Sequence, residues 1–538
     1  MSGRIQKKVD EVRTIRPALL SLLLVIIASF GLAAATGADQ WVPPQSQVQD
    51  FSNYGVIVTD SHDYQISTLT SYSTTTVNGQ ANQNYCPGYS SSGPCQFDGT
   101  GVSWVDATVL LPVCTTQGQT NCVESMALGT DGGTLQASTF TGMSAGQGLA
   151  ADASRGLPEG STVGLWNNSV VNGGGTTTYA THVVLHFGFG GGHFTPKSLY
   201  AAIEPYSTIS GDFQTPLAVQ SDRSGQLMAG VAFQQFQCAW TSAGFCGRLQ
   251  DFAPGTLASM TIRLSSEFGG WFKGRLKSPA LSVEPIDSSS NRITVTAEPV
   301  EVPELVASVP VTTSESQVKT FFSFVTAALP VVLPTNGWLF PSADPRAFDA
   351  IDVFRPATSD TSSGLVSLWT FGSTPGVGPC LADTSRVLGL VTTNAMAYDD
   401  HAPVFENGQL NYHVDGMHFE PDGSLTLGTY DLVMRSDVAR CLYHFSSAPV
   451  SASISVTNES GAENVATTTV NESNGWLHLG AYGFTFSAPT ISVQLTQAAP
   501  PAPKAKKVTI TCVSIRNKNR IRRISGVSPR CPISYRRR

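Results

Sequence analysis

The chain has 538 residues, too many for a single β-sandwich, so we expect two or three domains. Hydrophobic residues make up 41% of the chain and charged residues only 13%, a composition that supports sizeable cores and excludes an intrinsically disordered protein. Residues 17–500, the body, hold fifteen basic and thirty-seven acidic residues, a net charge of −22. Residues 501–538, the tail, hold twelve Lys or Arg and no acid. This asymmetry indicates that the tail has a partner of its own, and the body offers no basic stripe for nucleic acid.

Residues 1–38 have the pattern of an export signal. A basic segment precedes an apolar run from Ala18 to Ala35, and small residues follow it. This order is typical of a signal peptide, with cleavage after Ala35 or Ala38. The alternative is an uncleaved membrane anchor, because eighteen residues just span a bilayer. In either case we expect an extracellular protein at the cell surface.

Ten cysteines fall as close neighbours along the chain. An even count in an exported protein favours disulfides, and none of the spacings is the C-x-x-C of a zinc ribbon or a redox site. We therefore expect no cofactor and five structural disulfides. The expected pairs are Cys86–Cys95, Cys114–Cys122, Cys238–Cys246, Cys380–Cys441 and Cys512–Cys531.

Residues 39–310 form the first expected domain, which is rich in strands. Alternating apolar and polar residues, or short apolar runs bounded by Gly and Ser, predict each strand. The run Gly190-Gly191-Gly192 ends the strongest of them. The predicted strands are Tyr54–Asp60, Gln65–Tyr72, Val102–Val113, Thr181–Phe189, Gly230–Trp240 and Thr256–Leu264.

The proline-rich segment Pro299–Pro310 marks the expected domain boundary. The second domain, residues 311–498, begins with a predicted helix, Ser314–Leu329, and Pro330 stops it. A shorter helix is predicted to start at Asp344-Pro345. The apolar face of the first helix should pack on a sheet at the domain junction. Its residues are Val318, Phe321, Phe322 and Val325.

The segment Arg440–Gln497 is the clearest run of strands. Ile491, Val493 and Leu495 alternate with polar residues, and Asn474-Gly475 has the composition of a tight hairpin turn. Strands that are apolar on one side need a second layer to cover that side. We therefore predict a mainly all-β protein with two β-sandwich-like domains, one or two short helices and a small basic hairpin at the C-terminus.

Residues 499–538 combine a proline linker with the basic tail. Val508–Val513 and Ile521–Val527 are predicted strands, which Cys512–Cys531 would join into a small hairpin. Twelve positive charges without an acid suit a polyanion, and for an exported protein the nearest polyanions are envelope polymers and lipid headgroups. The predicted envelope-binding residues are Arg516, Lys518, Arg520, Arg522, Arg523, Arg536, Arg537 and Arg538.

The tail resembles a short basic module that closes many exported proteins of high-GC Gram-positive bacteria. The resemblance covers about forty residues and rests on Thr509–Val513, Ser525–Pro532, Tyr535 and the terminal Arg run. Residues 440–497 similarly resemble the last domain of large uncharacterised surface proteins from the same group. These resemblances imply a surface location and bring no catalytic residue with them.

Two motifs in the first half bear on chemistry. Gly142-Met143-Ser144-Ala145-Gly146 matches the G-x-S-x-G nucleophile elbow, but its flanks lack the strand-turn-helix context, so a flexible loop is the preferred interpretation. His182 and His186 share a strand face, and His193 follows the glycine run. They offer metal ligands, against the simpler interpretation of partly buried or edge histidines.

The segment 399–422 is the densest ionisable cluster. Its carboxylates and imidazoles suit a hard cation or acid–base chemistry, whereas Asp415-Gly416 and Asp422-Gly423 are ordinary turn dipeptides. We assign no metal and no catalytic residue. The residues that remain candidate ligands are His413, Asp415, His418 and Glu420.

Three functions therefore stand as hypotheses. The first is a non-enzymatic protein of the cell surface, held to the envelope by its basic tail. The second is a glycan- or ligand-binding adhesin that uses exposed aromatics such as Trp166, Trp240 or Trp271. The third is a secreted hydrolase that uses Ser144 or the 399–422 cluster. No nucleic-acid partner is expected.

Overall fold

The structure is a computed structural model, and the protein is mainly β, as predicted. It describes residues 53–60, 65–77, 80–86, 88, 102–130, 133–217, 220–221, 227–228, 237–312, 316–328, 337–446, 450–457, 463–464, 467–486, 490–497 and 506–538. The predicted signal, residues 1–38, and the linker prolines lie outside these ranges. Three α-helices and two short 3-10 helices occur within them; the latter are η1 (Ala153–Arg155) and η3 (Ser266–Phe268).

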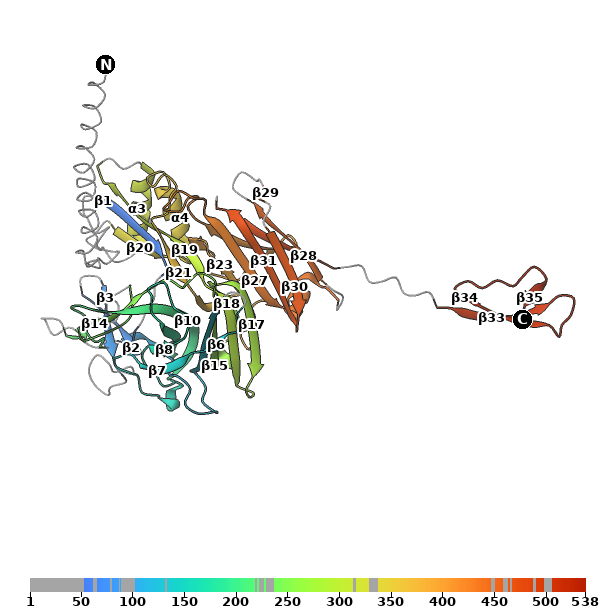
Figure 1. Ribbon diagram of the computed structural model, residues 1–538, viewed down its shortest axis with the longest axis horizontal. Helices are drawn as coiled ribbons and strands as arrows, with labels where there is room; N and C mark the ends of the chain where they lie inside the picture. The colour runs from blue at the N-terminus through green and yellow to red at the C-terminus, as the bar shows by residue number, and fades with distance from the viewer. Residues whose placement is uncertain are drawn as a thin grey trace, which may run out of the picture.

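One large sheet forms the centre of the body (Figure 1). Its neighbours are antiparallel except for the parallel pair β16 and β23. In spatial order the main path is β3 (Gln80–Cys86), β2 (Thr68–Val77), β4 (Val102–Leu110), β9 (Thr178–Gly190), β10 (His193–Ser210), β22 (Thr370–Thr374), β16 (Gly270–Arg275), β23 (Val387–Thr393), β27 (Leu427–Arg435), β31 (Trp476–Thr485) and β30 (Thr467–Ser473). Joined to its side are β7 (Thr139–Met143), β8 (Gly164–Asn167), β13 (Cys238–Ser242) and β14 (Phe245–Leu249). A separate pair is β11 (Gln220–Ser221) with β12 (Leu227–Met228).

Strands from both expected domains interleave in this sheet. β22 comes from the second half of the chain, yet it pairs with β10 on one side and β16 on the other, both from the first half. The expected boundary near residue 310 therefore does not separate the sheets. A pattern of alternation fixes which residues are strands, but it carries no information about pairing between strands distant in sequence.

A five-stranded sheet covers one face of the large sheet. The two sheets enclose the largest apolar core, to which Met260 and Val295 contribute from the smaller sheet and Leu185, Phe272 and Phe371 from the larger. This sandwich buries the alternating apolar residues of both layers. The order of the smaller sheet is β17 (Lys277–Pro285), β18 (Ser290–Glu298), β15 (Thr256–Ser265), β5 (Cys122–Thr130) and β6 (Gln136–Ala137).

A second sandwich lies on the opposite face of the large sheet. Trp271 and Val391 face this side, whereas their neighbours Phe272 and Leu390 face the first core. Ile491 and Val493, predicted to be buried, pack in this second core. The covering strands are β24 (Ala397–Tyr398), β26 (Gln409–Asp415), β32 (Thr490–Gln497), β28 (Val450–Thr457), β29 (Glu463–Asn464) and β25 (Val404–Glu406). The two sandwiches thus share their central layer.

The predicted helix is present as α3 (Ser316–Ala328). Its side chains Val318, Phe321 and Phe322 are buried in a core with the strand residue Val56, so the predicted packing on a sheet is confirmed for these three. The side chain of Val325 lies outside the described residues. α4 (Pro345–Phe354) starts as predicted, because the Asp344 carboxylate accepts the Arg346 N–H. The underlying sheet has the order β20 (Gly337–Pro341), β1 (Asn53–Thr59), β19 (Val300–Pro310) and β21 (Gly364–Leu368).

The segment Arg440–Gln497 differs from the prediction at its start. A helix, α5 (Ser436–Tyr443), covers its first residues and buries Val438 and Leu442 in the second core. These two residues are four apart, the spacing of one helix face, but the helix is too short to stand out from the strands that follow. The predicted turn at Asn474-Gly475 is present, with φ of 51° and 79°, values that suit these two residue types.

Four predicted disulfides are present: Cys114–Cys122, Cys238–Cys246, Cys380–Cys441 and Cys512–Cys531. Cys86 is also disulfide-bonded, and its predicted partner Cys95 lies outside the described residues. The Cys380–Cys441 bridge ties α5 to the loop that follows β22. Disulfides at this density indicate an oxidising, extracellular environment.

The basic tail forms a three-stranded sheet of its own, in the order β34 (Ile521–Gly526), β33 (Val508–Ser514) and β35 (Tyr535–Arg537). The predicted hairpin is β33 with β34, and β35 is an additional strand. The sheet stands away from the body in Figure 1. Its small interior holds Ile510 and Cys512, so the disulfide to Cys531 replaces most of a core.

Candidate functional site

Ser144 does not lie on a nucleophile elbow. It follows β7, but the chain continues without a helix, and the Ser144 N–H donates to the Val163 carbonyl at 2.8 Å. The Ser144 hydroxyl accepts the Val163 N–H at 3.2 Å. The hydroxyl is thus bonded to the backbone of buried Val163, and the geometry gives no support to a Ser144 hydrolase.

The three histidines near β9 do not meet. His182 is buried, with Nδ1 2.6 Å from the carboxylate of buried Glu204 on β10. His186 lies beside Thr108, 3.5 Å from its hydroxyl, and His193 is exposed at the start of β10. The His182–Glu204 pair instead fixes two neighbouring strands of the large sheet to each other.

The 399–422 cluster is divided among separate partners. His413 Nδ1 lies 3.0 Å from Asp399, and this hydrogen bond raises the pKa of His413. Asp415 binds Arg355 at 2.8 Å; burial raises the pKa of this carboxyl to about 6, although Arg355 opposes the change. His418 pairs with Asp360, and Glu420 accepts from the Ser424 hydroxyl. No group of three or more metal-binding side chains occurs in the part of the chain that the structure describes.

Two of the three tryptophans proposed as exposed aromatics are buried. Trp166 is 3% exposed and donates to the Thr181 hydroxyl at 3.0 Å. Trp271 is 1% exposed and belongs to the second core. Trp240 is half-buried against Tyr206. The expectation of an exposed aromatic platform is therefore wrong for Trp166 and Trp271, because burial of a large ring outweighs the polarity of its neighbours.

A cleft of about 710 Å³ lies over the central sheet, and the buried Trp271 is among the residues that line it. Its floor is β10, β22 and β16, where Tyr200 pairs with Gly372 and Gly372 with Lys273. Residues opposite each other on paired strands share a face, and the absence of a side chain at Gly372 lets the strands approach closely, since an added Cβ would lie 2.6 Å from the Leu199 carbonyl oxygen. The walls come from segments distant in sequence: Asp60, Pro375, Gly376, Leu381, Ala382, Tyr398 and Asp400.

Lys273 is a strongly perturbed titratable group of the cleft. Burial, reinforced by Arg275 and partly offset by Asp60, lowers the pKa of Lys273 to about 8. Its ammonium contacts the Asp400 carboxylate and lies 5.6 Å from the centre of the Tyr398 ring. The neighbouring Arg275 is fully buried, donates to Asp60 at 2.7 Å and stacks on the same ring at 4.3 Å. The charged groups of the cleft are therefore close to balanced.

Two buried polar atoms beside the cleft lack a hydrogen-bond partner among the described residues. Trp271 and Thr374 face each other on β16 and β22 and both line the cleft. Neither Trp271 Nε1 nor Thr374 Oγ1 has a hydrogen-bond partner among the described residues. A buried unsatisfied donor is costly, so each of these atoms would be stabilised by a polar partner. The sequence analysis did not predict the cleft. One signal was available: Trp271, Lys273 and Arg275 occupy every second position of one strand, which places three side chains with polar groups on the same inward face.

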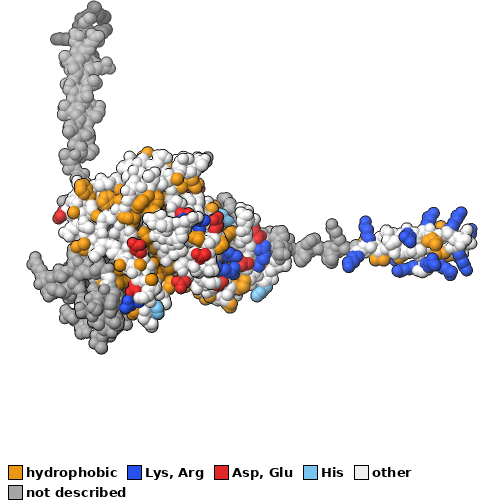
Figure 2. All heavy atoms as spheres, turned by 90° about the horizontal axis from the view of Figure 1, so that it is seen from below, with side chains coloured by type: hydrophobic (Ala, Val, Ile, Leu, Met, Phe, Trp, Pro, Cys, Tyr) orange, Lys and Arg blue, Asp and Glu red, His pale blue; other side chains and the backbone are white. Residues whose placement is uncertain are grey.

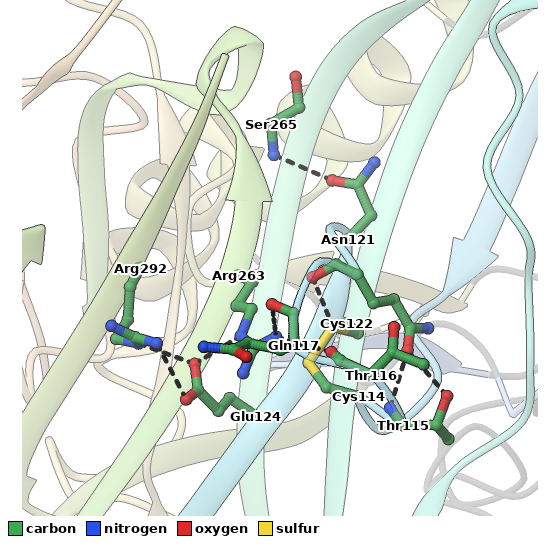
Figure 3. Close-up of a disulfide and its surroundings, with 11 residues drawn as sticks. Cys114, Thr115, Thr116, Gln117, Asn121, Cys122, Glu124, Arg263, Ser265 and Arg292 are labelled. Atoms are coloured by element: carbon green, nitrogen blue, oxygen red, sulfur yellow. Dashed lines mark hydrogen bonds and ion pairs between the residues drawn. A yellow bond between two sulfur atoms is a disulfide. The ribbon is translucent and has the colours of Figure 1, made fainter. Parts of the chain in front are cut away.

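The five-stranded sheet carries a separate charged cluster beside the Cys114–Cys122 disulfide (Figure 3). Glu124 accepts from Arg263 at 2.7 Å and from Arg292 at 2.8 Å. Arg263 also donates to the carbonyls of Thr116 and Gln117, inside the loop that Cys114–Cys122 closes. The hydrogen bond from Arg263, with that from Arg292, lowers the pKa of Glu124 to about 2. This cluster fixes a loop to a sheet and leaves no group free for chemistry.

The tail carries the strongest charge of the molecule. Residues 506–538 include eleven Lys or Arg and no acidic side chain, and all eleven are exposed. Figure 2 shows these side chains along the whole tail, with apolar side chains between them. Arg516, Lys518 and Arg520 lie in the β33–β34 turn, and the other predicted envelope-binding residues lie on β34, on β35 or at the C-terminus.

Fold and sites define a disulfide-linked, mainly β protein with a cleft on its body and a separate basic module at its C-terminus. Comparisons with protein-family models, with curated proteins and with solved structures found no match. Among the described residues, no helix has both the length and the apolar character needed to cross a bilayer.

Proposed function

We propose that this is a non-enzymatic protein of the cell surface that the basic tail holds to the anionic envelope. The observation that carries the proposal is the composition of the tail module: eleven exposed cations without one acidic side chain, on a disulfide-tied sheet separate from the body. A module with no internal counter-charge has a strong positive field, which attracts envelope polymers and lipid headgroups. The predicted export signal and the resemblance to terminal modules of surface proteins support this location.

The proposal is tested by retention on isolated envelopes across a salt series. The intact protein should be retained at low ionic strength and released at about 1 M salt, where the Debye length falls to about 3 Å. A protein truncated at Ala499 should not be retained. Equal retention of the two forms would show that the tail is not the attachment element. Retention of the intact form that does not change with salt concentration would show that charge is not the mechanism.

A matched pair of charge variants separates the tail from the body. Replacing Arg516, Lys518 and Arg520 by Gln should lower retention at intermediate salt, because all three are exposed tail cations. The control replaces three body lysines by Gln: Lys197, Lys277 and Lys319. It removes the same charge and should leave retention unchanged. An equal loss of retention in the two variants would show that binding depends on the net charge of the protein alone.

We infer a second function for the cleft, the binding of a neutral polyhydroxylated ligand such as an oligosaccharide. The unpartnered Trp271 Nε1 and Thr374 Oγ1 favour it, because sugar hydroxyls both donate and accept. The near balance of charge around Lys273 disfavours a strongly ionic ligand. A volume of about 710 Å³ is in the range of small-molecule sites.

Titration with a panel of neutral and acidic oligosaccharides, followed by tryptophan fluorescence, tests the cleft. At least one neutral sugar should saturate the signal, and Lys273→Met and Thr374→Val should each weaken its binding about tenfold or more. Lys277→Met, outside the cleft, is the control. The inference fails if no neutral sugar saturates, or if the cleft variants bind as the control does.

A further inference from the structure

The tail module exposes three isoleucines at the end where β33 finishes. Ile515, Ile521 and Ile533 are 62%, 50% and 101% exposed. The turn between β33 and β34 brings Arg516, Lys518 and Arg520 to the same end. We call these six residues the tip. Apolar and cationic side chains therefore occur together in the tip, whereas a surface that binds polyanions by charge alone has no need of the isoleucines.

The register of the strands places the three isoleucines together. Ile521 opens β34 opposite Val513, near the end of β33. Ile515 follows β33 directly, and its N–H donates to the carbonyl of Ser534, the residue next to Ile533. Backbone pairing thus gathers three positions, one on β34 and two in loops, at one end of the module.

The disulfide keeps the tip in place without a core. Cys512 on β33 is bound to Cys531, two residues before Ile533. The turn at Pro532 is closed by the Tyr535 N–H, which donates to the Pro532 carbonyl at 2.8 Å. The isoleucines are consequently held outward before any partner binds, which reduces the entropy lost on binding.

Resting on the proposed attachment through the tail, we propose that the tip binds an anionic lipid bilayer, with the isoleucines inserted among the acyl chains and the cations at the headgroups. A bilayer surface offers negative charge and an apolar layer within a few ångströms of each other, and the tip presents the complement of both. A soluble or wall polyanion offers only the charge. Insertion of apolar side chains adds a component of binding that salt does not screen.

The opposite end of the module supplies a matched control. Val508 and Val527 are 49% and 59% exposed, and the pairing of Val508 with Gly526 places them together at the end nearer the linker. A variant with both changed to Ser removes two exposed apolar side chains from the same sheet. Since they lie away from the tip, this variant should bind bilayers as the wild type does.

The experiment measures sedimentation of the full chain with vesicles of equal parts phosphatidylcholine and phosphatidylglycerol, and its binding to immobilised long-chain polyphosphate. Changing Ile515, Ile521 and Ile533 to Ser should weaken vesicle binding about a thousandfold or more, because each buried isoleucine contributes about tenfold or more. Binding to polyphosphate should not change. Wild-type binding to vesicles should also resist salt better than binding to polyphosphate.

The outcomes separate this inference from the attachment proposal. If the isoleucine variant binds vesicles as tightly as wild type, or if the valine control loses as much, insertion is refuted while attachment by charge stands. If truncation at Ala499 changes binding to neither surface, the attachment proposal fails as well. Intact Cys512–Cys531 in the variants, shown by peptide mapping without reduction, establishes that the module has formed.

A variant that removes no native contact gives a second readout. Ile533 is fully exposed, so Ile533→Trp should fold normally. Lipids brominated in the acyl chain should quench the added tryptophan more strongly than lipids brominated in the headgroup. Stronger quenching from the headgroup, or none from either lipid, would place the side chain outside the bilayer and contradict insertion.

Discussion

Glu124→Gln tests whether the charged cluster on the five-stranded sheet stabilises the fold. In the native protein the hydrogen bond from Arg263, together with that from Arg292, lowers the pKa of Glu124 from 4.5 to about 2. At about 1.4 kcal/mol per pKa unit, this difference corresponds to about 3 kcal/mol of stability in the ionised state. The Arg292 side chain is 37% exposed, so solvent screening reduces the expected loss on substitution to about 2 kcal/mol.

The pH dependence identifies the cause. A carboxyl with a lowered native pKa contributes its full stability above its unfolded pKa, 4.5, and loses it as the pH falls toward about 2. Urea unfolding followed by tryptophan fluorescence should therefore show a gap of about 2 kcal/mol between wild type and variant at pH 7, and less than half of that at about pH 3.

Glu284→Gln is the control for this prediction. Glu284 is 64% exposed and lies 3.7 Å from Arg292, so its substitution should change stability by less than about 0.5 kcal/mol. A gap for Glu124→Gln that is as large at pH 3 as at pH 7 would show that lost packing, and not the ion pairs, destabilises the variant. A gap within 0.5 kcal/mol at about neutral pH would refute the reasoning altogether.

Three further changes in stability follow from the fold, each measurable by the same unfolding assay. Phe322→Ala should lower the free energy of unfolding by about 3–5 kcal/mol, since it empties a buried site between α3 and its sheet. The control, Lys319→Ala at an exposed position of the same helix, should change it by less than about 0.5 kcal/mol, and equal losses would contradict the packing. Gly475→Ala should destabilise by about 1 kcal/mol because φ is 79°, and a neutral result would argue against the turn; Gly118, which is in open space, is the control. Replacing Cys380 and Cys441 by Ser should cost about 4 kcal/mol for a separation of 61 residues, more than the roughly 2.5 kcal/mol for Cys114–Cys122 with its separation of 8; the reverse order would refute a loop-entropy origin.

Local patterns were sufficient to predict much of the fold. The turn at Asn474-Gly475, the helix face of Val318, Phe321 and Phe322, and three of the four disulfides were each predictable because the relevant residues are close in sequence. Proline at the start of α4 is a signal of the same kind. In all these cases the physical cause acts over a few residues or a short loop, so a single sequence contains it.

The candidate site was not predictable in the same way. The cleft brings Asp60, Lys273 and Tyr398 together from strands whose pairing depends on contacts distant in sequence. The 399–422 cluster does not form a site for a related reason. Asp415 and His418 form ion pairs with Arg355 and Asp360, which lie outside the segment. Proximity in sequence is a poor guide to convergence of side chains when each strand directs alternate residues to opposite faces.

The insertion of β22 between β10 and β16 has a consequence for how the chain matures. A ribosome delivers both of those strands well before residues 370–374, so the emerging polypeptide carries two facing strand edges with open backbone donors and acceptors. Such edges are templates for aggregation, and pairing across so long a stretch is slow. We expect the nascent protein to depend on a holding chaperone until its second half is available, and we expect fragments that stop before β22 to be insoluble when expressed alone.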